Sequence, residues 1–107
     1  MQDPVTPIIA VQVTWDVGSN KGTVGDITVP ASNGPTQIQW TTGPNVASFM
    51  ITGLDATEFT PSSMPTQRTS FLTTDRNDNS NTYTYTVTAT HVDGRTSSHD
   101  PKIENGT

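Results

Sequence analysis

The chain has 107 residues, enough for one domain and too few for two of ordinary size, so residues 1–107 are expected to form a single domain. It contains no cysteine, which excludes disulfides, zinc–thiolate sites and iron–sulfur clusters. Ten acidic and only five scattered basic residues argue against nucleic-acid binding, and no apolar run approaches the roughly 18 residues that span a bilayer, which argues against membrane insertion.

The first half of the chain predicts short strands separated by turns. Two prolines make residues 1–7 an extended lead-in. Ile9, Val11, Val13 and Trp15 then alternate with more polar residues, which is the period of a β-strand. The next predicted elements, in chain order, are a glycine-rich loop at 16–25, a strand at 26–29, a turn at 30–35, and strands at 38–40 and 47–52.

The middle of the chain is the least regular part. In the strand at 47–52, Phe49 and Ile51 are expected to face inward because they are the more hydrophobic pair. Residues 53–68 carry two prolines that prevent a helix longer than one turn. Leu54 and Phe59 are expected to be buried beneath this irregular segment.

The clearest structural signal lies near the C-terminus, after a strand at 69–74 and a polar loop at 75–81. Residues 83–91 alternate with a period of two, with tyrosine, valine and alanine on one face and threonine on the other. Asp93-Gly94 predicts a tight turn, so the strand should return over residues 95–103 as a hairpin, leaving 104–107 as a tail. Strands recurring every 10–15 residues predict an all-β sandwich or barrel.

Two histidines in this hairpin raise the question of a metal site. A two-residue turn at Asp93-Gly94 would pair His91 with Thr96 and Thr88 with His99, which places the two imidazoles on opposite faces. A three-residue turn would reverse that parity. With no third ligand in the pattern, no metal site is expected at these histidines, and no cofactor is expected elsewhere.

The loop at 75–81 resembles the start of a calcium-binding loop. Asp75, Asn77 and Asn79 occupy alternate positions, as calcium ligands do. Ser80 stands where such a loop has glycine, and Thr86 stands where it has a bidentate glutamate. The alternative is a turn in which Asp and Asn side chains bind their own backbone.

No catalytic pattern is present, because the chain lacks cysteine and places no serine or histidine in a recognisable nucleophile context. We therefore expect the protein not to be an enzyme. Aromatic side chains beside Asn and Asp are typical of carbohydrate-binding surfaces, and Trp15 and Phe59 are candidates for such a surface. The alternative is that most of the seven aromatic residues fill the core. The candidate ligand-binding residues are Trp15, Phe59, Asp75, Asn77 and Asn79.

Residues 82–103 carry a resemblance to a known family. Tyr-Thr-Tyr-Thr-Val-Thr-Ala-Thr, an Asp-Gly turn and a closing strand resemble the last hairpin of bacterial immunoglobulin-like and fibronectin-type-III-like domains. In the same comparison, Trp40 resembles the core tryptophan of strand C, and Tyr83 or Tyr85 could take the tyrosine-corner position. The resemblance implies an antiparallel immunoglobulin-like β-sandwich of about seven strands in two sheets.

The resemblance also implies a function: we expect a non-catalytic module with a structural or protein-binding role. The alternative is a carbohydrate-binding module that uses loop and strand-end aromatics. The expected partner is therefore a protein or glycan surface. The compartment stays open, being cytoplasmic if Met1 is the native start and extracellular if the chain is an excised mature domain.

Overall fold

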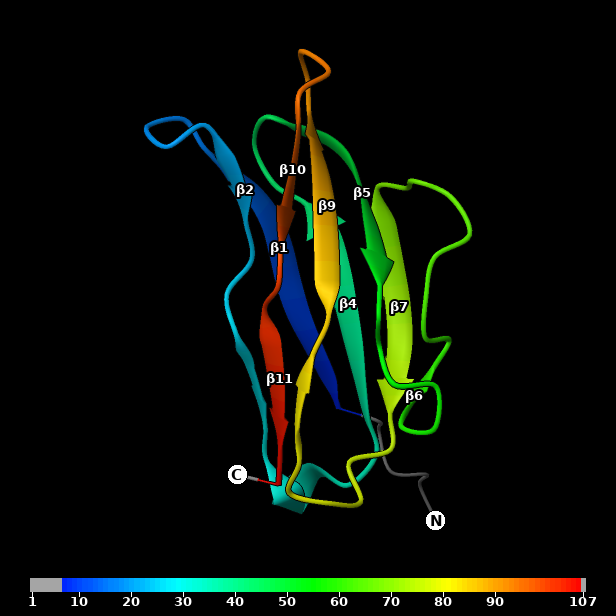
Figure 1. Ribbon diagram of the computed structural model, residues 1–107. Coiled ribbons are helices and arrows are strands. Elements are labelled where there is room, and N and C mark those ends of the chain that lie inside the picture. Colours follow the sequence, from blue (N-terminus) through cyan, green and yellow to red (C-terminus); the bar gives the residue numbers. More distant parts are fainter. Residues whose placement is uncertain (1–6, 107) are drawn as a thin grey trace.

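The computed structural model describes residues 7–106, and this part of the chain folds almost entirely as β-strands (Figure 1). The strands are β1 (Ile8–Asp16), β2 (Lys21–Thr23), β3 (Ile27–Val29), β4 (Thr36–Thr42), β5 (Val46–Thr52), β6 (Phe59–Thr60), β7 (Ser70–Asp75), β8 (Thr82–Thr84), β9 (Thr86–His91), β10 (Thr96–His99) and β11 (Lys102–Asn105). One 3-10 turn, η1 (Ala31–Asn33), precedes β4. No helix in the described residues could cross a membrane.

The strands form three sheets arranged in two layers. One layer is a five-stranded sheet in the order β2-β1-β4-β7-β6. The other layer holds two three-stranded sheets, β10-β9-β5 and β3-β11-β8, one above the other in Figure 1. The chain passes directly between the two small sheets twice, because β8 leads into β9 and β10 leads into β11. The all-β prediction is confirmed. The described residues contain more and shorter strands than the seven expected, and these strands form three sheets in place of two.

The expectation of a purely antiparallel arrangement is wrong at two places. β1 pairs with β4 in parallel, with Ile9 opposite Ile38 and Val11 opposite Trp40. β3 pairs with β11 in parallel, with Ile27 opposite Ile103. The cause is the hairpin from β1 to β2, which reverses the chain before β3. The glycine-rich stretch predicted as a loop contains β2, a strand too short to show an alternating pattern.

Two strands that were each predicted as continuous are interrupted, and the two breaks lie beside each other. The strand expected at 83–91 is split at Tyr85, and the strand expected at 95–103 is split at Asp100 and Pro101. Proline has no N–H for a strand ladder, but the Pro101 carbonyl still accepts a hydrogen bond from the Tyr85 N–H at 3.1 Å. The predicted tail is also shorter than expected, since β11 continues to Asn105. Of the predicted lead-in, residues 1–6 lie outside the described residues.

The core lies between the two layers and is formed by inward-facing strand residues. Phe49 and Ile51 are both fully buried, which confirms the predicted register of β5. Leu54 and Phe59 are buried as well, as predicted for the irregular segment. Burying apolar surface of this kind stabilises a fold by about 25 cal/mol per Å². The largest fully buried side chains include Trp40, Tyr85, Phe49, Phe59, Ile38 and Ile51.

The hairpin register differs by one residue from the prediction. The structure pairs Thr96 with Thr90 and His99 with Val87. The turn is longer than two residues, because the His91 N–H donates to the Arg95 carbonyl at 2.7 Å and Gly94 adopts a positive φ of 95°. The two histidines therefore share a face of the hairpin. They do not meet, since His99 lies opposite a residue four positions from His91, a distance of roughly 13 Å along a strand.

Candidate functional site

Two adjacent turns form a continuous surface at one end of the molecule, which we name the hairpin-tip surface (residues 16–20 and 91–95). The first turn joins β1 to β2 and is closed by Asn20, whose φ of 59° lies in the left-handed region that asparagine tolerates. The second turn joins β9 to β10. The Arg95 guanidinium contacts the side-chain oxygen of Asn20, so the two turns are linked although they lie 75 residues apart.

Trp15 lies at the base of the hairpin-tip surface and is only 6% exposed. His91 lies against one side of the indole, with ring centroids 4.8 Å apart, and the guanidinium carbon of Arg95 lies 5.8 Å from the ring centre. A cation at that distance is attracted to the indole face. Trp15 is therefore covered by its neighbours and does not form an open platform.

The second turn is organised by Asp93. Its carboxylate accepts hydrogen bonds from the Arg95 backbone N–H at 3.0 Å and from the Arg95 side chain at 2.6 Å, and one of its oxygens lies 2.9 Å from Nδ1 of His91. These interactions, led by the backbone hydrogen bond from Arg95, lower the pKa of Asp93 to about 2. The turn is thus held by a carboxylate that stays ionised well below neutral pH.

Each turn also presents an apolar side chain to solvent. Val17 is 72% exposed and Val92 is 64% exposed, which makes them two of the four large hydrophobic side chains exposed in the described residues. Around Val17 the loop backbone is ordered by Asp16, which accepts from the Gly18 N–H at 3.0 Å and from the Ser19 hydroxyl at 2.9 Å. The surface therefore combines exposed apolar tips with fixed polar groups.

A second feature lies at the opposite end of the five-stranded sheet. We name it the polar cluster; its members are Glu58, Asp75, Asn77, Asn79, Tyr83 and Asn105. Asp75 is at the end of β7 and pairs with Thr36 at the start of β4, whereas the hairpin-tip surface adjoins the other end of β4. The polar cluster thus brings together three of the predicted ligand-binding residues, Asp75, Asn77 and Asn79.

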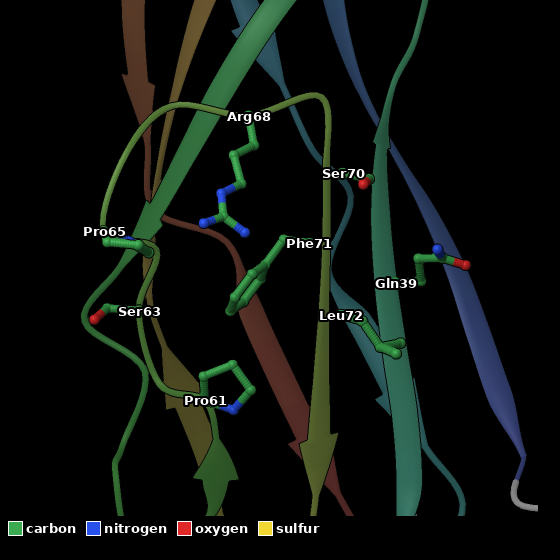
Figure 2. Close-up of a pocket in the computed structure, with 8 residues that line it drawn as sticks. All are labelled: Gln39, Pro61, Ser63, Pro65, Arg68, Ser70, Phe71 and Leu72. Carbon is green, nitrogen blue, oxygen red and sulfur yellow. The ribbon is translucent and has the colours of Figure 1, made fainter.

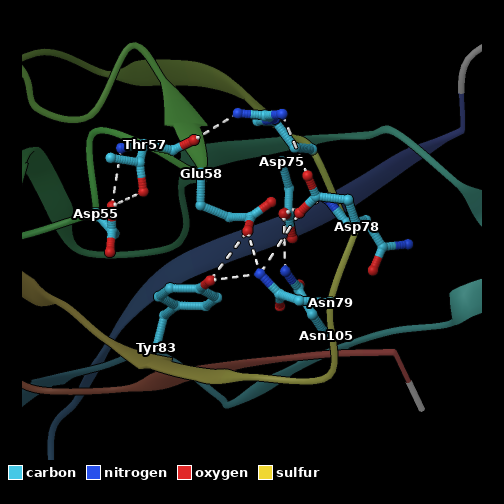
Figure 3. Close-up of polar contacts among 10 residues, drawn as sticks. Asp55, Thr57, Glu58, Asp75, Asp78, Asn79, Tyr83 and Asn105 are labelled. Carbon is cyan, nitrogen blue, oxygen red and sulfur yellow. Dashed lines mark hydrogen bonds and ion pairs between the residues drawn. The ribbon is translucent and has the colours of Figure 1, made fainter.

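The side chains of the polar cluster form two hydrogen-bonded groups, one around Glu58 and one around Asp75 (Figure 3). One oxygen of Glu58 accepts from the Tyr83 hydroxyl at 2.9 Å and from the Asn79 amide at 2.5 Å. One oxygen of Asp75 accepts from the Asn105 amide at 3.0 Å. Asn77 has a positive φ of 50°, and its backbone N–H donates to that same Asp75 oxygen at 2.9 Å. The predicted turn in which side chains bind their own backbone is therefore present.

The electrostatics of this cluster are unfavourable for a buried carboxylate. Burial raises the pKa of Asp75, and the nearby charges of Glu58 and Asp78 raise it further. The hydrogen bonds from Asn77 and Asn105 lower this pKa but do not outweigh burial. Asp75 is completely buried and Glu58 is 3% exposed. Two acidic side chains thus share a buried environment without a basic partner in the contacts described.

The predicted aromatic platform is not formed by Trp15 and Phe59. Phe59 is 1% exposed and packs edge-on against Tyr83, with ring centroids 5.3 Å apart. Trp15 lies at the other end of the molecule. The five predicted ligand-binding residues are therefore divided between the two ends, and both aromatic members are core residues, as the alternative interpretation expected.

A groove of about 350 Å³ provides a third surface (Figure 2). Its lining residues come from the irregular segment after β6 and from the neighbouring strands: Gln39, Pro61, Ser63, Pro65, Arg68, Ser70, Phe71 and Leu72. In Figure 2 the side chains of Arg68 and Phe71 lie between the loop that carries the prolines and β7. Among these eight residues only Arg68 is ionisable, so the lining offers no pair of groups for acid–base catalysis.

The sequence did not indicate three members of the polar cluster, Glu58, Tyr83 and Asn105. Glu58 ends a local turn that begins at Asp55, whose carboxylate accepts from the Thr57 N–H at 2.8 Å. Asn105 was placed in the tail. No local pattern could have linked them, because the contacts depend on how β6, β7 and β11 come together.

No protein-family model matches this chain, and no similar sequence was found among curated proteins.

Proposed function

We propose that this chain is a non-catalytic immunoglobulin-like module that binds a protein partner through the hairpin-tip surface. The proposal has two parts, the type of fold and the location of the binding surface. Each part is supported by separate observations.

The strand pairing supports the immunoglobulin-like part. An immunoglobulin sandwich places strands B, E and D together in one sheet and strands C, F and G in the other. Here β4, β7 and β6 are neighbours in one layer and correspond to strands B, E and D. In the other layer β5, β9 and β10 are neighbours and correspond to strands C, F and G, with β8 and β11 continuing strands F and G. In this assignment β1 takes the place beside strand B, but it runs parallel to β4.

This assignment also changes the role expected for two aromatic residues. Trp40 lies on β4, the strand B position, and not on strand C as the resemblance implied. Its indole nevertheless contacts Tyr85 at the strand F position, with ring centroids 5.6 Å apart. The Tyr83 hydroxyl bonds to Glu58 and does not bond to the backbone, so it does not form a tyrosine corner.

The two ends of the described chain, Pro7 and Gly106, lie away from the hairpin-tip surface. The Pro7 carbonyl accepts from the Gln37 N–H at 2.8 Å, beside the start of β4, and Asn105 contacts Asp75 at the same end. Both ends of the described chain thus lie at the end with the polar cluster (Figure 1).

The observation that carries the proposal is the pair of exposed valines on the two linked turns of the hairpin-tip surface. Val17 and Val92 are more than half exposed although each turn is held rigid by hydrogen bonds. Exposed apolar side chains on ordered loops are typical of protein-binding surfaces, which combine apolar centres with polar rims. The carbohydrate alternative has no comparable support, because its two aromatic residues are buried.

A comparison of three tagged proteins tests the proposal: the unmodified chain, a Val17→Asp/Val92→Asp double variant, and a Leu72→Asp control. Leu72 is also exposed, at 43%, but lies in the groove and not on the hairpin-tip surface. All three should share one melting midpoint. We expect a protein from source extracts to be retained by the unmodified chain and the control and to be lost from the double variant. Equal retention by all three, or retention of a glycan in place of a protein, would contradict the proposal.

A further inference from the structure

The polar cluster contains four buried oxygen atoms with no hydrogen-bond partner. They are Oε1 of Glu58, Oδ2 of Asp75, Oδ1 of Asn77 and Oδ1 of Asn105. The four residues are all at least nine-tenths buried, between 0% and 7% exposed. Buried polar atoms are almost always satisfied in folded proteins, so four such atoms in one cluster require an explanation.

All four atoms are acceptors that lack a hydrogen-bond donor or a cation, because the orientation of the two amides is fixed by their neighbours. The Asn77 amide nitrogen donates to the carbonyls of Pro30 at 2.9 Å and Gly34 at 2.8 Å. The Asn105 amide nitrogen donates to the Asp75 carboxylate. Exchanging oxygen and nitrogen in either amide would place two acceptors together, so the unpaired atom in each case is the oxygen.

We propose that these four oxygens form a calcium-binding site. Two carboxylates supply a charge of −2, and two carboxamides supply neutral oxygens, which together are the hard oxygen donors that Ca²⁺ prefers. Ca²⁺ takes about six to eight oxygens in a flexible arrangement, so the four side chains leave positions for water or for further oxygens. The proposal does not depend on the proposed binding function, since the site lies at the other end of the molecule.

This ligand set differs from the linear loop pattern in the sequence. The missing bidentate glutamate of that pattern is replaced by Glu58, which approaches from the segment before β6. The Glu58 carbonyl accepts from the Arg76 N–H at 3.0 Å, which holds Glu58 beside Asp75. Asn105 comes from β11. No three His, Asp or Glu side chains of the described residues gather at one point, so the site depends on its amide oxygens.

Calcium would remove the repulsion in this cluster and tie three segments together. Without a cation, the Asp75 and Glu58 charges disfavour each other in a buried environment. A dication between them converts that repulsion into attraction. The ion would also join three parts of the chain: the segment before β6, the loop after β7, and β11 itself. Binding should therefore stabilise the folded state.

Gly106 provides a further constraint on this end of the protein. Its φ is 72°, and a Cβ added there would lie 2.7 Å from the Asn79 carbonyl oxygen. The chain after β11 thus packs directly on the loop that carries Asn77 and Asn79. Such close packing leaves the loop little freedom to move its oxygens to other partners.

Thermal unfolding with calcium tests the proposal first. After treatment with EDTA, adding about 5 mM CaCl₂ should raise the unfolding midpoint by roughly 5 °C or more in a saturable way. Magnesium at the same concentration should give less than half that rise, because Mg²⁺ requires a more regular octahedron and loses its water reluctantly. An unchanged midpoint with calcium, or an equal rise with magnesium, would overturn the assignment.

Variants and a direct binding signal locate the ion. Terbium, which binds at calcium sites, should luminesce when Tyr83 is excited, because the Tyr83 hydroxyl lies 2.9 Å from Glu58, and excess calcium should abolish the signal. Glu58→Gln and Asp75→Asn should each weaken calcium binding roughly tenfold or more. Glu58→Gln keeps an acceptor for Tyr83 and Asn79 and removes the repulsion, so we expect it to fold.

The matched control is Asp78→Asn. Asp78 carries the same charge on the same loop but is exposed and paired with Arg76 at 3.3 Å. This variant should bind calcium within about threefold of the unmodified protein, the loss expected when only a nearby exposed charge is removed. If Asp78→Asn weakened binding as much as Glu58→Gln, the ion would be held by the acidic surface and not by the four buried oxygens, which would contradict the proposal.

Discussion

The indole N–H of Trp40 donates a hydrogen bond to the hydroxyl of Tyr85, with 3.2 Å between nitrogen and oxygen, across the space between the two layers. Trp40 is fully buried and Tyr85 is 1% exposed, so water cannot replace either partner. Burial also raises the pKa of the Tyr85 phenol. This bond fixes how the two layers pack at the centre of the core.

Replacing Tyr85 with Phe should therefore destabilise the protein. The indole N–H would be left buried and unpaired, which costs about 1–3 kcal/mol in the free energy of unfolding. Denaturant unfolding of the single variants Tyr85→Phe and Trp40→Phe and of the double variant gives the coupling energy. We expect a coupling above about 0.5 kcal/mol, and purely additive effects would show that the bond does not contribute.

Gly22 permits close contact between β2 and the opposite layer. A Cβ added at Gly22 would lie 2.6 Å from the Cβ of Ala89 on β9. Gly22→Ala should therefore lower the free energy of unfolding by about 1–3 kcal/mol through overpacking. Gly25→Ala is the matched control, because an added Cβ there meets nothing within 4 Å. Equal stability of the two variants would mean that the layers are farther apart than described.

Asp93 should titrate well below a normal aspartate. Its folded-state pKa of about 2 is lower than the value near 3.9 in an unfolded chain, so its stabilising contribution is complete above about pH 4 and is lost as the pH falls through about 2. Carboxyl carbon NMR should give a midpoint near 2 for this residue. Asp93→Asn should flatten the dependence of stability on pH in that window, and a midpoint near 4 would disprove the hydrogen-bonded turn.

Arg95 should shield Trp15 from solvent. Removing its guanidinium in Arg95→Ala would open the indole face that it covers and also break the link to Asn20. We expect stronger acrylamide quenching and a red shift of the emission, against a constant background from the fully buried Trp40. Arg76→Ala removes an exposed arginine whose partner is Asp78, and it should leave the spectrum unchanged. No change in Arg95→Ala would show that other groups cover Trp15.

The strands that could be predicted from the sequence are those with a clear alternation on one buried face. Residues 9–15 and the Phe49 and Ile51 register follow that rule, because the hydrophobic residues of one face must be buried together. β2 has only three residues, too short to display a period, and it lies in the stretch predicted as a loop. The parallel pairing of β1 with β4 depends on the direction in which distant segments meet, which no local pattern encodes.

The candidate sites were predictable only in part, for a related reason. The spacing of Asp75, Asn77 and Asn79 predicts a turn whose side chains bind their own backbone as one of two alternatives, and that turn is present because these residues are neighbours in the chain. Glu58 and Asn105 join them through tertiary contacts. Likewise, Trp15 near a glycine-rich loop looked accessible, but His91 and Arg95 cover it from a hairpin more than 70 residues away. The register of that hairpin depended on one extra turn residue.

A crystal structure determined in excess CaCl₂ would test the account most directly, because its central claim is that four unpaired oxygens at one end of the sandwich hold an ion. We predict a density peak about 2.3–2.6 Å from the free oxygens of Glu58, Asp75, Asn77 and Asn105, the range for calcium–oxygen distances. Water alone at hydrogen-bond distances from these atoms, or a direct oxygen–oxygen hydrogen bond between the Asp75 and Glu58 carboxyl groups, would contradict it.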